Sequence, residues 1–407
     1  MFVPDGYSLH SYGRMVADDA RTRPFVEALR QTIRPESVVL DIGTGAGFFA
    51  LVAAQLGAAR VYAIEPDDAI DVAKLCAART ENRDRITWVQ GISTQIDLPE
   101  RVDVVVADLH GNLPFHNGMI ASLIDARSRH LKPDGIIFPA RDVLRVVPAT
   151  APLEYAELER PWGQNDYSLD LGAGRRFVAN SWWRARQKPI GDAQLLSEPE
   201  TWGVIDYLRV QSANLDNSLQ FTLHRKGTMH GYYVWFDGEM MDRLGYSNAP
   251  NLPELVYGRT FFPLEQPVEV EPGERVDLRL STKLMDGNHF YRWDSRFMDG
   301  EGALRAHFRQ STFNSRPIQR RHLQASQSSY VAALSKNGEA AQTVLNAISR
   351  AQSLGDIAQL LVRDFPRLFD TPASATDYVM KLIGKYAEPD AGSRSESVSS
   401  LRIQAPT

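Results

Sequence analysis

The chain contains a single cysteine, Cys76, among its 407 residues. One thiol cannot form an intramolecular disulfide, so the sequence fits a reducing compartment and a fold held by its hydrophobic core. It also has no run of about 18 apolar residues and no signal-like N-terminus. These absences predict no membrane span and a cytoplasmic location.

A surplus of positive charge is missing too, since 45 Lys and Arg against 50 Asp and Glu give a net charge of −5 at pH 7. Proteins that bind nucleic acid through the phosphate backbone usually carry a broad basic surface, so no nucleic-acid partner is expected. Zinc-ligand spacing is absent as well. His110 and His116 lie six residues apart with Asp108 alone as a third ligand, so no metal is expected.

The chain does contain a glycine-rich segment between two predicted strands. The apolar residues 38–42 lead into Gly43, Gly45 and Gly47, and a helix over 48–56 and a strand over 61–65 follow. Glycines at such a turn let the backbone approach a ligand closely, and this order is typical of a nucleotide-binding βαβ unit. Glu65 lies about 20 residues after the glycines, where a carboxylate can accept hydrogen bonds from both ribose hydroxyls.

The turn itself discriminates between two classes of cofactor. An acid, Asp41, precedes Gly43; it would repel a pyrophosphate and attract the ammonium group of a methionine moiety. S-adenosylmethionine (SAM) therefore fits better than a dinucleotide. NAD or flavin binding, and a glycine turn that binds nothing, remain as alternatives.

Further strands and helices extend this unit into a parallel sheet. Strands are predicted over 86–91 and 101–108, a helix over 119–130, a turn over 132–135 and a strand over 136–139. The largely apolar strand 101–108 is typical of strands buried on both faces. Ser93 and Thr94 follow the strand 86–91, where they are expected to bracket an adenine.

Three segments carry a resemblance to a known family. Tyr7 and Tyr12 lie in Y-S-L-H-S-Y, residues 18–22 read D-D-A-R-T, and residues 131–139 read L-K-P-D-G-I-I-F-P. Over about residues 7–300 the chain resembles class I SAM-dependent methyltransferases and, within them, the protein arginine methyltransferases. The resemblance implies that Arg21 holds the SAM carboxylate, that a β-barrel walls the substrate groove, and that the protein is a homodimer. The expected cofactor-binding residues are Tyr12, Arg21, Asp41, Gly43, Thr44, Gly45, Glu65, Pro66, Ser93, Thr94 and Asp108.

The chain departs from that family where the acceptor is bound. Two glutamates clamp the guanidinium in the arginine enzymes, and their positions hold Asp108 and Asn117 here. A guanidinium, with a pKa above about 12, would lose counter-charge in such a pocket. His110 and His116 would instead suit an acceptor with an accessible neutral nitrogen, such as an imidazole. The four catalytic candidates are therefore Asp108, His110, His116 and Asn117.

Three of these candidates also have a structural interpretation. Asp108 could cap a loop, and the two histidines could be polar loop residues that cover the cofactor. Farther along, Leu255-Val256-Tyr257 stands where the family has threonine, histidine and tryptophan. Trp182, Trp183, Trp235 and Trp293 are expected in the barrel core more than in contact with a peptide.

The predicted fold class is α/β with two additions. Residues 1–143 form a Rossmann-like SAM-binding domain and residues 144–300 an antiparallel β-barrel. A linker over 301–327, a small helical domain over 328–388 and a disordered tail over 389–407 follow. Helices are predicted over 340–347, 353–365 and 373–386.

The helical domain resembles the winged-helix peptide-recognition domains of enzymes that modify ribosomal peptides, which implies a docked precursor peptide. A structural or dimerising cap and winged-helix DNA binding are the alternatives. The predicted function is a SAM-dependent N-methyltransferase acting on an arginine or histidine of a peptide or protein, with a ribosomal natural-product precursor as one such substrate. Two other functions stay open: a methyltransferase for small molecules or free amino acids, and a non-catalytic SAM-fold protein that binds peptides.

Overall fold

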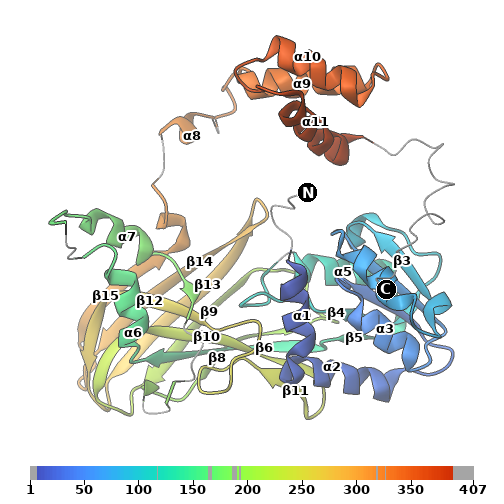
Figure 1. Ribbon diagram of the computed structural model, residues 1–407. Helices are drawn as coiled ribbons and strands as arrows, with labels where there is room; N and C mark the ends of the chain where they lie inside the picture. Colours follow the sequence, from blue (N-terminus) through green and yellow to red (C-terminus); the bar gives the residue numbers. More distant parts are fainter. Residues whose placement is uncertain are drawn as a thin grey trace, which may run out of the picture. The chain divides into compact units, whose positions relative to one another are not determined.

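The chain consists of two compact units, residues 1–317 and 318–407, in the computed structural model (Figure 1). The structure describes residues 7–116, 118–163, 167–185, 190–191, 194–317, 320–325 and 327–387. Within these residues, no helix combines the length and apolar character needed to cross a membrane.

The first unit contains a five-stranded parallel sheet in the order β3-β2-β1-β4-β5. All five residues of the central strand β1 are buried, as expected for an apolar strand covered on both faces. The strand order reverses between β1 and β4, and open α/β sheets bind ligands outside the carboxyl ends of the strands at such a point. The strands are β1 (Val38–Ile42), β2 (Arg60–Glu65), β3 (Ile86–Gln90), β4 (Val102–Ala107) and β5 (Leu131–Phe138).

Helices connect these strands, and two further helices precede them. Asp18 ends α1 and also caps the start of α2, where its side chain accepts from the backbone N–H of Arg21. This cap sets the direction in which α2 leaves α1. The helices of this part are α1 (Leu9–Ala17), α2 (Asp19–Thr32), α3 (Phe48–Gln55), α4 (Ala69–Ala77) and α5 (Met119–Arg129), with short 3₁₀ turns η1 (Arg83–Arg85) and η2 (Ser93–Gln95).

Residues 132–135 do not form the turn predicted from the sequence but lie inside β5. Val102 pairs with Leu131 and Val104 with Ile136, so the four residues bulge out opposite Asp103. Lys132 is held at the bulge by an ion pair with Asp103 at 2.7 Å. A Pro-Asp-Gly sequence signals a chain reversal locally, but pairing on both sides of it keeps the strand continuous.

Two antiparallel sheets complete the first unit and correspond to the predicted barrel (Figure 1). One has the order β7-β12-β10-β6-β8, with β11 on β10; the other has the order β15-β14-β13-β9. The elements are β6 (Arg141–Ala149), α6 (Pro152–Glu159), η3 (Gly172–Gly174), α7 (Arg175–Val178), β7 (Trp183–Arg184), β8 (Glu200–Asp206), β9 (Leu215–Thr222), β10 (Gly227–Met241), β11 (Leu244–Ser247), β12 (Thr260–Val270), β13 (Arg275–Met285), β14 (Asn288–Met298), β15 (Leu304–Ser311) and η5 (Thr312–Asn314).

The barrel core follows from alternation along its strands. In β13 and β14, buried and outward residues alternate, and Trp293 is fully buried with its indole N–H donating to the carbonyl of Pro263. Trp235 is buried as well, which agrees with the core interpretation of these two tryptophans. The predicted linker over 301–327 needs correction, because its residues 304–311 form β15 and pair with β14.

The second unit contains α8 (Arg320–Ala325), α9 (Lys336–Ile348), α10 (Leu354–Asp364) and α11 (Pro372–Tyr386). The last three helices match the three predicted helical segments, and each begins at a side-chain cap: Ser335, Ser353 and Thr371. Their buried residues, Val344, Leu361 and Val379 among them, form a core of their own. No strand occurs within residues 327–387, so these residues lack the wing of the predicted winged helix. The predicted tail over 389–407 lies outside the described residues.

The predicted fold class is thus confirmed. A Rossmann-like parallel sheet, an antiparallel barrel-like part and C-terminal helices follow one another along the chain.

Candidate cofactor and acceptor site

A cavity of about 940 Å³ lies at the carboxyl ends of the parallel strands and reaches the antiparallel part of the first unit. Its volume falls at the upper end of the usual range for small-molecule sites, about 300–1,000 Å³. The glycine loop after β1 and the end of β2 line one side. Trp182, Arg184, Val256, Tyr257 and Tyr291 line the other. One cavity can therefore hold a cofactor and an acceptor next to each other.

The glycine loop has the left-handed backbone that its sequence requires. Gly43, Gly45 and Gly47 have φ values of +70°, +54° and +86°. A Cβ on Gly45 would lie 2.4 Å from the ring of Tyr12, so this glycine also permits a close approach. Tyr12 in turn meets Tyr7 edge to face, with ring centroids 5.9 Å apart. The two aromatics predicted from the resemblance thus cover the loop.

Glu65 braces the same loop from the end of β2. One carboxylate oxygen accepts from the backbone N–H of Gly45 at 2.8 Å and the other from that of Asp67 at 3.0 Å. Burial raises the pKa of Glu65, while these two hydrogen bonds lower it. Each oxygen keeps further lone pairs for a ligand, because a carboxylate has about four acceptor positions. Glu65 is therefore positioned to bind hydroxyl groups.

Asp41 does not line the cavity, contrary to the prediction. It is 1% exposed, accepts from the hydroxyl of Thr44 at 2.6 Å, and lies beneath the loop. Burial raises the pKa of Asp41 to about 7. Thr94 is exposed and also lies outside the cavity lining, whereas Ser93 belongs to it. The side chain of Asp41 thus contacts the loop residue Thr44 and does not line the cavity.

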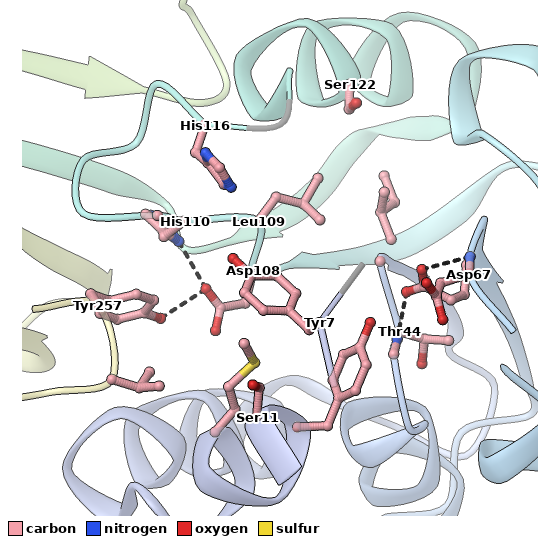
Figure 2. A pocket seen from close by; sticks show the side chains of 18 of the residues that line it. Tyr7, Ser11, Thr44, Asp67, Asp108, Leu109, His110, His116, Ser122 and Tyr257 are labelled. Atoms are coloured by element: carbon pink, nitrogen blue, oxygen red, sulfur yellow. Dashed lines mark hydrogen bonds and ion pairs between the residues drawn. The ribbon is translucent and has the colours of Figure 1, made fainter. Parts of the chain in front are cut away.

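Asp108 lies where the two sides of the cavity meet (Figure 2). Its Oδ2 accepts from Arg21 Nε at 2.5 Å and from a second nitrogen of the same guanidinium. Its Oδ1 accepts from the Tyr257 hydroxyl at 2.8 Å and pairs with Nδ1 of His110 at 2.9 Å. Burial by itself would raise the pKa of Asp108, but the charges of Arg21 and His110 outweigh it and hold that pKa well below its usual range. Asp108 is an ionised carboxylate at neutral pH.

Arg21 is nearly buried between several partners. It is 6% exposed, and besides Asp108 it donates to the Met15 carbonyl at 2.8 Å and to the Tyr257 hydroxyl at 3.2 Å. Its guanidinium also lies 5.4 Å from the ring centroid of Phe49. A fixed guanidinium at the edge of the cavity is suited to bind a carboxylate there, as the resemblance implies.

His110 is held between two carboxylates. Its Nδ1 faces Asp108, and its Nε2 lies 2.8 Å from Oδ2 of Asp142, which also accepts from the Tyr207 hydroxyl. Burial would lower the pKa of His110, but Asp142 and Asp108 raise it to about 9. The sequence contains no local signal for the pairing with Asp142, because the two residues lie 32 positions apart, one in the loop after β4 and the other in β6.

The loop between β4 and α5 supplies two more groups. His116 lines the cavity and is partly exposed, and partial burial lowers its pKa. The side-chain nitrogen of Asn112 is buried in the cavity wall and has no hydrogen-bond partner. An unpaired buried donor at this point fits a polar ligand group. Asn117, the fourth catalytic candidate, lies outside the described residues.

The cavity thus brings together most of the predicted site. The predicted residues that line it are Tyr12, Arg21, Gly43, Thr44, Gly45, Glu65, Pro66, Ser93, Asp108, His110 and His116. Lining residues that the sequence did not predict include Met15, Asp67, Leu109, Arg184 and Tyr291. Asp67 and Leu109 were open to prediction because they follow Glu65 and Asp108 at strand ends. Arg184 and Tyr291 depend on how the barrel meets the sheet, and Met15 depends on the packing of α1.

Comparisons with known proteins agree with this geometry. The family model described as ribosomal protein L11 methyltransferase (PrmA) matches residues 19–139. The probable protein arginine N-methyltransferase 6 of Arabidopsis thaliana is 30% identical over 242 residues, which cover 56% of this chain and 55% of that protein. Protein arginine N-methyltransferase 2 of Mus musculus is 30% identical over 288 residues, covering 67% and 64%. The chain therefore spans between about half and two thirds of the length of these relatives.

Solved structures of low sequence identity share the fold. The PRMT1 enzyme-prozyme heterotetrameric complex of Trypanosoma brucei, solved with AdoHcy, matches with a TM-score of 0.67 at 21% identity, covering 75% of this chain and 98% of that one. Protein arginine methyltransferase 10 of Arabidopsis thaliana gives a TM-score of 0.64 at 21% identity, with the same coverage. In fold and in the make-up of its site the chain thus resembles the class I SAM-dependent methyltransferases. Within that class the chain resembles the protein arginine methyltransferases, as predicted.

Proposed function

We propose that this protein is a SAM-dependent N-methyltransferase that modifies an arginine side chain of a peptide or protein. The observation that carries the proposal is the ionised Asp108, which shares one cavity with the glycine loop and Glu65. The relatives named as arginine methyltransferases support arginine as the acceptor. Catalysis then consists of alignment of the acceptor nitrogen and exclusion of water.

The residues around the cavity fit SAM. Glu65 would accept from the ribose hydroxyls, Arg21 would bind the amino-acid carboxylate, and Ser93 would contact the adenine. When bound, SAM supplies a methyl group activated by a positively charged sulfur. The unpaired side-chain nitrogen of Asn112 in the cavity wall supports a polar ligand here.

Asp108 would bind and orient the acceptor. A guanidinium stays protonated at neutral pH, so an ionised carboxylate is the natural counter-charge for it. Asp108 lies toward the barrel side of the cavity, between Tyr257 and the glycine-loop residue Thr44 (Figure 2). Trp182 and Tyr291 would form an aromatic wall along the substrate side chain.

A histidine acceptor is the second candidate, and one observation favours it. Asp108 already accepts from Arg21, His110 and Tyr257. The positive charges of Arg21 and His110 balance the negative charges of Asp108 and Asp142, which leaves no net negative charge for a guanidinium. A neutral imidazole needs no net negative pocket. His116 at the cavity edge would then act as a general base, because its lowered pKa keeps it neutral at pH 7.

The C-terminal unit is proposed to dock the substrate. Its three helices α9, α10 and α11 enclose a core of their own, so they can form a separate peptide-binding module. A peptide docked on this module would have a high effective concentration at the active site. A precursor peptide of a ribosomal natural product is the proposed substrate, and a cytoplasmic homodimer is the proposed state of the enzyme.

The test is mass spectrometry of peptides and free amino acids incubated with the enzyme and isotopically labelled SAM. The panel contains Arg, His, Lys and Asn peptides, and the Asp108→Asn variant is the control. Label on arginine that disappears with Asp108→Asn supports the proposal. Label on histidine alone replaces it with the second candidate. Transfer only to free amino acids, or binding of SAM without any transfer, would contradict a peptide methyltransferase.

A further inference from the structure

Four side chains form a buried chain of polar contacts that runs from the cavity into the protein. Asp108 after β4 meets His110, His110 meets Asp142 at the start of β6, and Tyr207 after β8 donates to Asp142. The side chains of His110 and Asp142 are both 0% exposed. Asp142 and Tyr207 do not line the cavity. The inner half of this chain therefore acts on any bound substrate only through His110 and Asp108.

The contacts of His110 define its protonation state. Both ring nitrogens lie within 2.9 Å of a carboxylate oxygen, and an ionised carboxylate can only accept. When both carboxylates are ionised, each nitrogen must therefore carry a hydrogen, and the ring is then an imidazolium. Its plane is fixed by Phe236, which stacks at a centroid distance of 4.8 Å and an angle of 7°.

The charges around this imidazolium balance. Arg21 and His110 are the cations, and Asp108 and Asp142 the anions. Three phenols also face this group: Tyr246 and Tyr257 lie edge-on or tilted beside the ring, and Tyr207 contacts Asp142. Burial keeps the pKa values of all three phenols well above the usual value for tyrosine, so they stay neutral. Without Asp142, the cluster would hold an unbalanced buried cation.

We propose that Asp142 is a positioning residue that keeps His110 doubly protonated, so that His110 holds the Asp108 carboxylate in place for the acceptor. The inference rests on the proposed function of Asp108. If His110 lost its proton, Nδ1 could present a lone pair to Asp108 in place of a hydrogen. The carboxylate would then lose one of its donors and turn away from the acceptor.

The test compares Asp142→Asn with Tyr207→Phe in the full-length protein. Asparagine keeps the shape of Asp142 but removes its charge, while Tyr207→Phe removes one donor and leaves that charge. ¹⁵N NMR of histidine-labelled protein, with the His110 signals assigned from a His110→Gln variant, gives the protonation of both ring nitrogens against pH. The rate of methyl transfer is measured over the same pH range, together with thermal unfolding.

In the wild type we expect both nitrogens of His110 to carry hydrogens at pH 7.5, and the rate to fall as the pH rises through about 9. In Asp142→Asn, the NMR midpoint and the alkaline limb of the rate should move down together by about one pH unit or more. In Tyr207→Phe, both should stay within about half a unit of the wild type. An arginine substrate does not titrate in this range, so the fall in rate at high pH reports a group of the enzyme.

Three results would overturn the inference: a neutral His110 ring in the wild type at pH 7.5, an unchanged midpoint in Asp142→Asn, or an equal loss of rate at every pH, which is the mark of a merely structural role. Where Asp142→Asn fails to fold, a neutral His110 ring in the wild type would still refute the inference. The NMR readout needs no acceptor. A failure of methyl transfer on every acceptor would therefore refute the proposed function separately.

Discussion

Asp41 and Glu65 end neighbouring parallel strands, yet they have different surroundings. Glu65 faces the cavity and braces the glycine loop through two backbone N–H groups, whereas Asp41 lies below the loop at 1% exposure. The difference arises from the direction of each side chain at its strand end. The two acids therefore allow two separate predictions, one on ligand binding and one on stability.

Replacement of Glu65 by Gln should weaken SAM binding by about 1–3 kcal/mol, because one ribose hydroxyl loses a charged acceptor. Isothermal titration calorimetry measures this change. Thr94→Ala is the matched control, since Thr94 is exposed and outside the cavity lining, and it should leave the affinity unchanged. Equal affinities of Glu65→Gln and wild type would remove Glu65 from the cofactor site.

Asp41 should make folding stability depend on pH. Its pKa of about 7 in the folded protein lies above the ordinary value of 3.8, so the folded state binds more protons between these values. The stability from this group is fully present below about pH 4 and is lost as the pH rises through about 7. The unfolding free energy of Asp41→Asn, minus that of the wild type, should therefore increase as the pH rises from about 4 to 7. Urea unfolding across that range measures the difference, and a difference that is constant with pH would contradict the prediction.

At the scale of elements, the loop between β1 and α3 shows how a short sequence encodes a binding surface. Three glycines with positive φ form a tight turn, and the turn places backbone N–H groups beside Glu65. Ile64 and Glu65 of β2 accept from backbone N–H groups of this turn, and Tyr12 of α1 packs directly onto it. A side chain at Gly45 should therefore disturb both the turn and the helix that covers it.

Gly45→Ala should abolish detectable SAM binding, since the added methyl group would overlap Tyr12 and the backbone is in the left-handed region. Gly13→Ala is the control: Gly13 lies in α1 with open space around it and an ordinary helical backbone. It should stabilise α1 by about 0.5–1 kcal/mol and leave SAM binding intact. Thermal unfolding and calorimetry measure both variants. SAM binding by Gly45→Ala at wild-type affinity would contradict the close packing of Tyr12.

At the scale of the whole molecule, the chain divides into two units with separate cores. The cavity and all its lining residues belong to the first unit. Deletion of residues 328–407 should therefore leave SAM affinity and the turnover of short peptides within about threefold of the wild type. If the helices dock the substrate, the KM for a long peptide substrate should rise by about 10²-fold, because the effective concentration is lost. Steady-state kinetics on peptides of two lengths measure the effect, and an unchanged KM for the long peptide after the deletion would assign the helices a structural role.

The parallel sheet, the glycine loop and the three C-terminal helices were determined by the sequence itself. Apolar runs, glycines and helix caps act within a few residues of one another, so their patterns survive without tertiary context. The sequence predicted boundaries and turns less accurately. It predicts a turn at 132–135, where pairing with β4 forms a bulge in β5, and a linker at 301–327, where pairing with β14 forms β15.

Only the tertiary structure decided which polar groups meet. Arg21 and Asp108 lie 87 positions apart, and His110 and Asp142 lie 32 apart. Tyr257, between β11 and β12, donates to Asp108 over a separation of 149 positions. Local patterns carry no information about such pairs, because the contacts depend on strand register and on how the barrel packs against the sheet. The sequence therefore determined where a cofactor could bind, and the packing of distant elements determined the charge of the acceptor pocket.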